Sequence, residues 1–191
     1  YDPPRGSIWI GGKDIHDLTL QSLRTNIAYV PQEGFLFSTT IRDNIAFSNR
    51  QLDQDRVEEA SKMAEIYGNI TELPDRFETK LGERGLTLSG GQRQRTSLAR
   101  GLVKHAPILL LDDSVSAVDA VTETNIIRNL RKVRRGKTTL LIAHRVSALR
   151  HADRIYVLDE GRIVEQGSHE QLMAKGGYYA SLCKLQEEGI S

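Results

Sequence analysis

Two adjacent acids, Asp112 and Asp113, are the residues best placed to do chemistry. They follow the apolar run ILLL at 108 to 111 and open the stretch DDSVSAVD. A buried parallel strand that ends in an acid places the carboxylate at the carboxyl edge of a sheet, where α/β proteins bind ligands. Such an acid can hold Mg²⁺, and a carboxylate one residue further on can orient an attacking water. In isolation, the same pattern also fits a polar strand end followed by a turn.

A second segment, Ser89-Gly90-Gly91-Gln92, precedes a helical pattern. Its S-x-x-Q spacing is that of a capping box, which is typical of an ordinary helix start. The two glycines are poor helix formers, but their bare N–H groups could approach a phosphate closely at a helix N-terminus. The residues alone leave both interpretations open.

A third segment, LLIAHR, ends an apolar run at His144. A lone histidine is usually structural. Here it would close a strand beside the one that ends at Asp112, so its imidazole would face the same crevice.

The composition describes a soluble globular protein of one ordinary domain. The 191 residues are 39% hydrophobic and 27% charged, and the net charge of +1 gives no field that would draw the chain to nucleic acid or an anionic membrane. The single cysteine, Cys183, cannot form an internal disulfide, which fits a reducing compartment. The longest apolar runs are too short to span a bilayer.

Short β-rich runs alternate with helical patterns, which predicts an α/β fold with a mainly parallel sheet flanked by helices. We expect strands at 7–10, 27–30, 108–112, 138–143, 154–158 and 162–165, the last two forming a hairpin. The strands at 108–112 and 138–143 are apolar throughout, as strands covered on both faces should be. Asp53 should cap a helix that runs to about Ile66, and Ile126, Leu130 and Val133 mark another helix. Residues 41–83 read as an inserted helical subdomain, and 168–187 as two short helices broken at Gly176-Gly177.

Together these segments resemble the nucleotide-binding domain of ATP-binding-cassette (ABC) transporters over essentially the whole chain. LSGGQ resembles the family signature, ILLLD the Walker B strand, SAVD at 116–119 the D-loop, and His144 the switch histidine. YVPQEGFLFSTTIRDNIAF is similar to the Q-loop region of exporters, with Gln32 as its glutamine. LGERG at 81–85 resembles the exporters' loop that contacts the transmembrane part.

The resemblance implies a P-loop NTPase core that works as a head-to-tail pair, with each ATP between one domain's Walker motifs and the other's signature. Gln32 and Asp112 would then serve Mg²⁺ and its waters, and Asp113 and His144 would be catalytic. The nucleotide-binding set would be Gln32, Ser89, Gly90, Gly91, Gln92 and Asp119, with Asp119 crossing the interface. Phosphoryl transfer suits such a site, because catalysis there is mostly positioning and charge neutralisation.

The resemblance also implies how the chain divides into domains, which cofactors and partners it has, and where in the cell it acts. Residues 1–40 would be part of the ATPase core up to the Q-loop, 41–105 a helical subdomain ending in the signature helix, and 106–191 the rest of the core with the C-terminal helices. The cofactors would be ATP and Mg²⁺. The partners would be a second nucleotide-binding domain and a transmembrane domain, at the cytoplasmic face of the cell membrane.

The chain departs from the family pattern first by having no GxxxxGK[ST] phosphate loop. Its only GKT, at 136–138, fails because Arg131 stands where the first glycine is required. In the family this loop lies upstream of the segment that begins here as YDPPRG. We therefore expect a fragment that lacks the family's first strands and phosphate loop, and that binds ATP poorly by itself.

The second departure is Asp113, which stands where the family usually has a catalytic glutamate. Aspartate is one methylene shorter, and a misplacement of about 1 Å can cost ~10²-fold in rate, or about 2.7 kcal/mol of barrier. We expect the degenerate half of a heterodimeric multidrug-type exporter, whose own site is slow while its signature completes the partner's site.

Two other classes of function stay open at this stage. One is a soluble ABC-type ATPase in DNA repair, chromosome structure or translation, although the long coiled coils of the repair and chromosome proteins have no counterpart here. The other is a non-catalytic regulatory or interaction domain. The basic run RNLRKVRRGK at 128–137 could be a nucleic-acid patch, but it lacks interleaved aromatics and is better interpreted as a solvated face at a helix end. We therefore expect no nucleic-acid partner.

Overall fold

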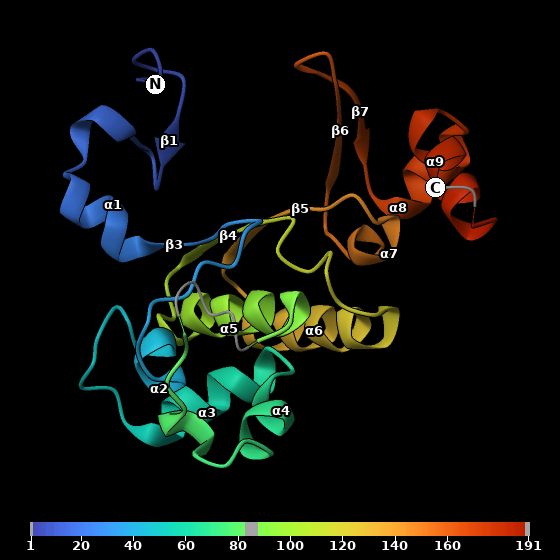
Figure 1. The fold of residues 1–191 in the computed structure, drawn as a ribbon. Coiled ribbons are helices and arrows are strands. Elements are labelled where there is room, and N and C mark those ends of the chain that lie inside the picture. Colours follow the sequence, from blue (N-terminus) through green and yellow to red (C-terminus); the bar gives the residue numbers. More distant parts are fainter. Residues whose placement is uncertain (1, 83–87, 190–191) are drawn as a thin grey trace.

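A three-stranded parallel sheet lies at the centre of the computed structural model, which describes residues 2–82 and 88–189. Its strands are β3 (Ile27–Val30), β4 (Ile108–Asp112) and β5 (Thr138–Ile142), in the order β3-β4-β5 (Figure 1). Leu109 of β4 pairs with Ala28 on one side and Thr139 on the other. Because all three strands run the same way, their carboxyl ends meet at one edge of the sheet.

Two hairpins flank this sheet. One consists of β1 (Trp9–Ile10) and β2 (Lys13–Asp14), and the other of β6 (Ile155–Asp159) and β7 (Arg162–Gly167). Both stand on the side of the sheet opposite to helices α5 (Gly90–Val103) and α6 (Ala120–Val133), as Figure 1 shows. All six expected strands are therefore present, the last two as the expected antiparallel pair, and the two-residue β2 is an addition.

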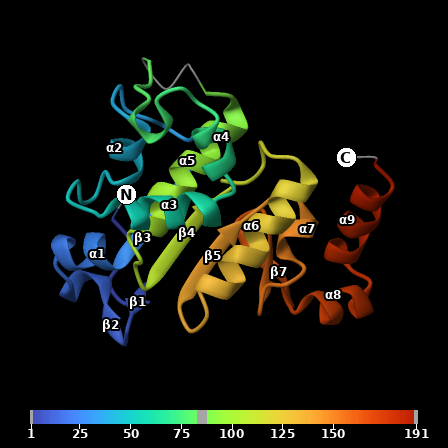
Figure 2. The same ribbon diagram turned by 90° about the horizontal axis from the view of Figure 1, so that it is seen from below.

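Between β3 and β4 the described residues form helices joined by loops, and the one β-pairing among them is an isolated bridge between Thr40 and Lys80. This confirms an inserted helical segment, which packs on α5 (Figure 2). Outside α5 and α6 the helices are η1 (Ile15–Asp17), α1 (Leu20–Asn26), α2 (Ile41–Ile45), α3 (Gln54–Met63), α4 (Tyr67–Thr71), η2 (Arg76–Glu78), α7 (Val146–Leu149), α8 (His169–Lys175) and α9 (Tyr178–Glu187).

The helix expected from Asp53 to Ile66 is shorter than predicted. Asp53 occupies the N-cap position of α3, but its side chain makes no capping hydrogen bond. The helix ends at Met63 because Glu65 adopts a left-handed backbone with φ of 56°, which a continuing α-helix does not allow. The tail forms two helices as predicted, and Gly176 ends α8 in the left-handed conformation.

The expectation that β5 is covered on both faces is wrong. Leu140 is 53% exposed and Ile142 is 51% exposed, whereas Leu109 and Leu111 of β4 are each 1% exposed. Helices α5 and α6 cover one face of the sheet, while the hairpins leave much of the opposite face of β5 open (Figure 1). The apolar sequence of β5 therefore predicted a burial of both faces that the described residues of this chain do not provide.

The core lies between the sheet and its helices, with Leu98 of α5 and Ile126 of α6 fully buried. A second, smaller cluster joins α7, β6, α8 and α9 around Val146, Ile155 and Tyr179. Among the described residues, no helix has both the length and the apolar character needed to cross a membrane.

Candidate functional site

The carboxyl edge of the sheet carries the predicted acids and the glutamine that follows β3. Tyr29 Oη donates a hydrogen bond to Asp112 Oδ2 at 3.1 Å, and Gln32 Nε2 donates one to Asp113 Oδ2 at 3.2 Å. Asp112 is partly exposed and Gln32 is exposed. The structure therefore places Gln32 beside Asp113, with the carboxylate of Asp112 accessible at the same edge.

Asp113 is held more tightly than an acid in an ordinary turn. Its side chain is buried, its N–H donates to Ile142 O at 2.9 Å, and its φ is 45°. A non-glycine residue in that left-handed region is uncommon, and such strain gathers at functional sites. The backbone thus fixes the direction in which the Asp113 carboxylate leaves the strand.

The segment Ser89–Gln92, which we call the signature segment, begins α5 with the predicted capping box. Ser89 Oγ accepts from Gln92 N–H at 3.2 Å, and Gln92 Oε1 accepts from Ser89 N–H at 2.9 Å. The amides of Gly90 and Gly91 find no acceptor among the residues that the structure describes. The helix start is therefore well capped, and within the described part of the chain two of its N–H groups still lack an acceptor, so the two interpretations of this segment are compatible.

Gly91 has a packing role that the sequence did not reveal. A Cβ atom at this position would lie 2.7 Å from the carbonyl oxygen of Ala117, closer than real Cβ contacts. The D-loop, residues 116–119, therefore packs directly on the first turn of α5. Only a glycine at position 91 allows that approach.

Asp119 is the N-cap of α6. Its Oδ1 accepts from the N–H groups of Val121 at 3.1 Å and Thr122 at 2.9 Å, and its Oδ2 accepts from Thr122 Oγ1 at 2.7 Å. These bonds, from Thr122 above all, hold the pKa of the Asp119 carboxyl below its usual value. Asp119 is exposed, so its charge is available on the surface.

His144 follows β5 and is exposed at the same edge as Asp112, which pairs with Ile142. Its carbonyl oxygen accepts a hydrogen bond from Gln186 Nε2 at 2.7 Å, and the Gln186 Oε1 accepts from Val146 N–H at 2.8 Å. The turn that carries His144 is therefore clamped by α9. Sequence reasoning missed Gln186, because no local pattern marks a contact across 42 residues.

A buried acid joins the turns that follow β4 and β5. Glu123 of α6 is 2% exposed, and its carboxylate contacts Arg145 Nη1 at 3.2 Å and Ser147 Oγ at 2.5 Å. The same Arg145 Nη1 donates to Val118 O in the D-loop at 2.9 Å. The residue that follows His144 therefore ties the His144 turn to the D-loop.

Three phenylalanines form an exposed aromatic cluster after Gln32. The rings of Phe37 and Phe47 stack at 4.5 Å, and Phe35 meets Phe37 edge-on at 5.0 Å. The guanidinium of Arg100 lies 5.5 Å from the Phe37 ring and 5.7 Å from the Phe47 ring. Phe35, Phe37 and Phe47 are each at least 36% exposed, so an exposed aromatic surface follows Gln32 in the chain.

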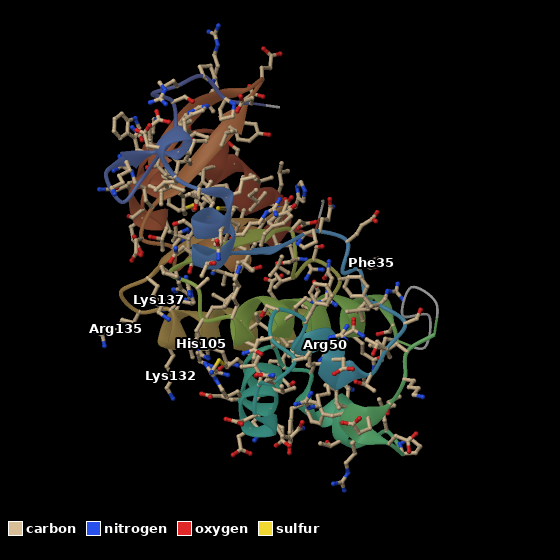
Figure 3. The ribbon with its side chains drawn as sticks, turned by 90° about the vertical axis from the view of Figure 1, so that its left-hand side faces the viewer. Phe35, Arg50, His105, Lys132, Arg135 and Lys137 are labelled. Atoms are coloured by element: carbon tan, nitrogen blue, oxygen red, sulfur yellow. The ribbon has the colours of Figure 1, made fainter. Side chains whose placement is uncertain are left out.

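The basic run at 128–137 lies away from this cluster. Figure 3 shows Lys132, Arg135 and Lys137 pointing outward on one side, with Phe35 on the other. Arg134 is the exception to the predicted solvated face, since it is 9% exposed and donates to the carbonyls of Pro107 at 2.9 Å and Thr138 at 2.7 Å. It satisfies backbone groups beside the starts of β4 and β5.

Oxygen ligands gather at the sheet edge, but they are few. In 2–82 and 88–189, no group of three or more His, Cys, Asp and Glu side chains could hold a metal ion. Asp112, Asp113 and the Gln32 amide are nevertheless hard oxygen donors. They fit Mg²⁺, which proteins typically hold through one or two carboxylates together with waters and substrate phosphates.

A parallel sheet with acids at its carboxyl edge, an inserted helical segment and a capped, glycine-rich helix start is the architecture of a nucleotide-binding ATPase core. The chain matches the family described as ABC transporter over residues 1–116, and it belongs to that family. Most of the predicted loop LGERG, at residues 83–85, lies outside the described residues.

Relatives and a solved structure agree with this assignment. The chain is 48% identical over 191 residues to ABC transporter B family member 6 of Dictyostelium discoideum, covering 100% of this chain and 28% of that protein. It is 45% identical over 189 residues to the ATP-dependent lipid A-core flippase of Legionella pneumophila (strain Paris), covering 99% and 32%. A bacterial Atm1-family ABC exporter, solved with ATP bound, matches with a TM-score of 0.93 and 45% identity over 98% of this chain and 33% of that one. The chain spans about a third of the length of the relatives it matches.

Proposed function

We propose that this chain is part of the nucleotide-binding domain of an ABC exporter, and that it couples ATP binding and hydrolysis to export of a substrate across a membrane. The observation that carries the proposal is the contact between Gln32 and Asp113 at 3.2 Å. It unites a residue after β3 with a residue after β4 at the edge where α/β proteins bind ligands. The similarity to exporters along almost the whole chain supports the same conclusion.

At its own site the chain would hold Mg-ATP from the sheet edge. Asp112 and Gln32 are suited to Mg²⁺ and its waters, and the ion would neutralise charge on the phosphates. Asp113 would orient the attacking water, and His144 would contact the γ-phosphate. Catalysis would then consist mainly of positioning, which is what the fixed backbone of Asp113 and the clamped turn of His144 provide.

The signature segment would serve a second ATP, held by a partner nucleotide-binding domain in a head-to-tail pair. The N–H groups of Gly90 and Gly91, which have no acceptor in 2–82 and 88–189, and the positive end of the α5 dipole favour a phosphate. Asp119, exposed beside this segment on the D-loop, would cross to the partner. Because Asp113 replaces glutamate, the partner's site would carry most of the turnover in a heterodimer of unlike halves.

The phosphate loop would come from residues of the whole protein outside this chain. The outer edge of β5 pairs with no strand among the described residues, and the exposed Leu140 and Ile142 offer an apolar surface to such a segment. The proposed domain division stays at residues 1–40, 41–105 and 106–191.

The aromatic cluster of Phe35, Phe37 and Phe47 suits contact with a transmembrane domain at the cytoplasmic face of the membrane.

Two measurements test this function. Calorimetric titration of Mg-ATP into the chain alone should show weak binding, because the chain contains no phosphate-loop lysine; tight binding would contradict that claim. The full-length transporter should hydrolyse ATP, and Asp112→Asn should lower its affinity for Mg²⁺. A full-length protein without ATPase activity would overturn the proposed function.

A further inference from the structure

The side chain of Gln94 lies where three segments of the candidate site meet. It is 7% exposed and projects from the second turn of α5. Its Nε2 lies 3.2 Å from Gln32 O, 3.3 Å from Asp113 O and 3.4 Å from Ser116 Oγ. Its Oε1 accepts from Ala117 N–H at 2.9 Å. One buried amide therefore contacts the Q-loop, the acid after β4 and the D-loop.

Two glycines bring these segments within reach of α5. A Cβ on Gly34 would lie 2.9 Å from Arg93 O and 3.1 Å from the Cα of Gln94. A Cβ on Gly91 would lie 2.7 Å from Ala117 O. The Q-loop and the D-loop thus both approach the α5 backbone closely around Gln94. Contacts this tight transmit small displacements, because packed interiors have little free volume.

Under the proposed function, the segments that Gln94 joins serve two different ATP molecules. Gln32 and Asp113 belong to this chain's own site, whereas Ser89–Gln92 and the D-loop belong to the partner's site. Gln94 lies two residues after the signature segment on the same helix, and α5 packs on β3, the strand that leads to Gln32 (Figure 2). A shift of Gln32 or Asp113 would therefore move α5 and the D-loop through the Gln94 amide.

We propose, on the basis of that function, that Gln94 is a positioning residue that couples this chain's own nucleotide site to the signature segment and D-loop offered to the partner's ATP. It touches neither nucleotide. Among residues 2–82 and 88–189, its amide is the one side-chain group that bonds to the Q-loop, to the Asp113 backbone and to the D-loop at once. Loss of the amide leaves Gln32 O and Ala117 N–H to find other partners, leaves Asp113 O bonded only within its own segment, to Ser116, and so uncouples the segments.

The test uses the full-length transporter with its partner and measures ATPase rate, KM for ATP and melting temperature. Gln94→Leu should lower kcat at least ~10-fold, since a misplacement of about 1 Å costs ~10²-fold. KM should change little. Gln94→Glu keeps the acceptor for Ala117 N–H but replaces the donor, so it should be similarly slow. Ser61→Ala is the control, because it removes a buried 2.7 Å hydrogen bond to Val57 O within α3, away from the three segments that Gln94 joins; it should stay within ~2-fold of wild type.

Coupling is measured by adding Gln32→Ala to the wild type and to each Gln94 variant. In the protein that keeps Gln94, Gln32→Ala should slow turnover. In the protein that already carries Gln94→Leu, adding Gln32→Ala should slow turnover further by less than ~2-fold, because the effects of coupled residues are not additive. The inference would be overturned if Gln32→Ala slowed turnover by the same factor with and without Gln94→Leu, or if the turnover of the Gln94→Leu protein stayed within ~2-fold of wild type. If Gln94→Leu does not assemble, the same comparison is made with Gln94→Glu. A wild type without ATPase activity would instead contradict the proposed function.

Discussion

Gln32 and Asp113, 81 residues apart in the chain, meet in a side-chain hydrogen bond of 3.2 Å at the carboxyl edge of the sheet. The glutamine reaches the edge at the end of β3, and the aspartate follows β4 directly. The bond orients the carboxylate of Asp113, while its backbone is fixed by the pairing with Ile142 O. Under the proposed function, the distance that the Asp113 carboxylate can reach from this position would decide how well it orients a water.

Asp113→Glu should raise turnover at this chain's own site. The longer side chain advances the carboxylate by about 1 Å, and a correction of that size is worth up to ~10²-fold in rate. Site-resolved single-turnover hydrolysis in the full-length transporter measures the effect. Asp113→Asn is the control, and it should abolish the residual rate at this site. Equal hydrolysis at both sites of the wild type would contradict a degenerate half.

Gln186→Leu should loosen the turn that carries His144. The substitution removes two hydrogen bonds, to His144 O and from Val146 N–H, each worth about 1 kcal/mol. Hydrogen exchange of the Val146 amide should accelerate about 10-fold or more as a result. Gln171→Leu is a useful comparison, because Gln171 completes the capping box of α8 and should leave Val146 protected. Unchanged exchange at Val146 would show that α9 does not hold this turn.

Arg100→Met should destabilise the fold by about 2–4 kcal/mol. Each of the three hydrogen bonds from the charged guanidinium is worth roughly 1.5–3 kcal/mol, but the cost of burying the guanidinium offsets part of their sum. Arg100 donates to Asn44 O at 2.7 Å, to Asn44 Oδ1 at 2.8 Å and to Phe35 O at 2.8 Å. Arg100→Lys should recover only part of the loss, since lysine lacks the planar fork of donors. Urea unfolding measures the change. The exposed Arg135→Met is the control, expected within about 0.5 kcal/mol of wild type.

Glu165 should stabilise the fold in a way that is lost at acid pH. Its carboxylate accepts from the N–H groups of Tyr178 at 2.9 Å and Tyr179 at 3.0 Å, at the start of α9. These bonds, first that from Tyr179, hold the pKa of Glu165 below its usual value of 4.5. A lowered folded-state pKa means that the stabilisation is present above the unfolded pKa and is lost as pH falls through the folded one.

Glu165→Gln should therefore reduce the stability at pH 7, and the difference from wild type should shrink below about pH 4. Urea unfolding at a series of pH values measures it, with the exposed Glu72→Gln as a control. A difference that is the same at pH 7 and pH 3 would show that the charge of Glu165 contributes nothing.

The sheet could be predicted from the sequence because its strands carry strong local signals. ILLLD and TTLLI are short apolar runs bounded by turns, and the structure has strands there with nearly the predicted ends. Burial was less predictable. The exposure of Leu140 and Ile142 depends on what covers β5, and an apolar strand does not encode which segment covers it.

The candidate site was predictable in its parts and not in its connections. Asp112, Asp113 and His144 were found because each ends an apolar run, and Ser89 and Gln92 because they form a capping box. Gln94, Gln186 and Arg134 have no such marker. Their roles come from contacts with residues distant in sequence, which only the folded chain brings together. The predicted catalytic and nucleotide-binding roles themselves stay predictions.

The central claim is that the signature segment of this chain completes an ATP site whose nucleotide is held by a second domain. Ser89→Arg in the full-length transporter tests it most directly, with Ser168→Arg as the matched control, because Ser168 and Gln171 form the same capping box at the start of α8. Both variants lose one helix cap, worth about 1 kcal/mol. We predict that Ser89→Arg lowers ATPase turnover at least ~10²-fold with equilibrium ATP binding retained, and that Ser168→Arg leaves turnover near wild type. Equal turnover in the two variants would contradict the claim.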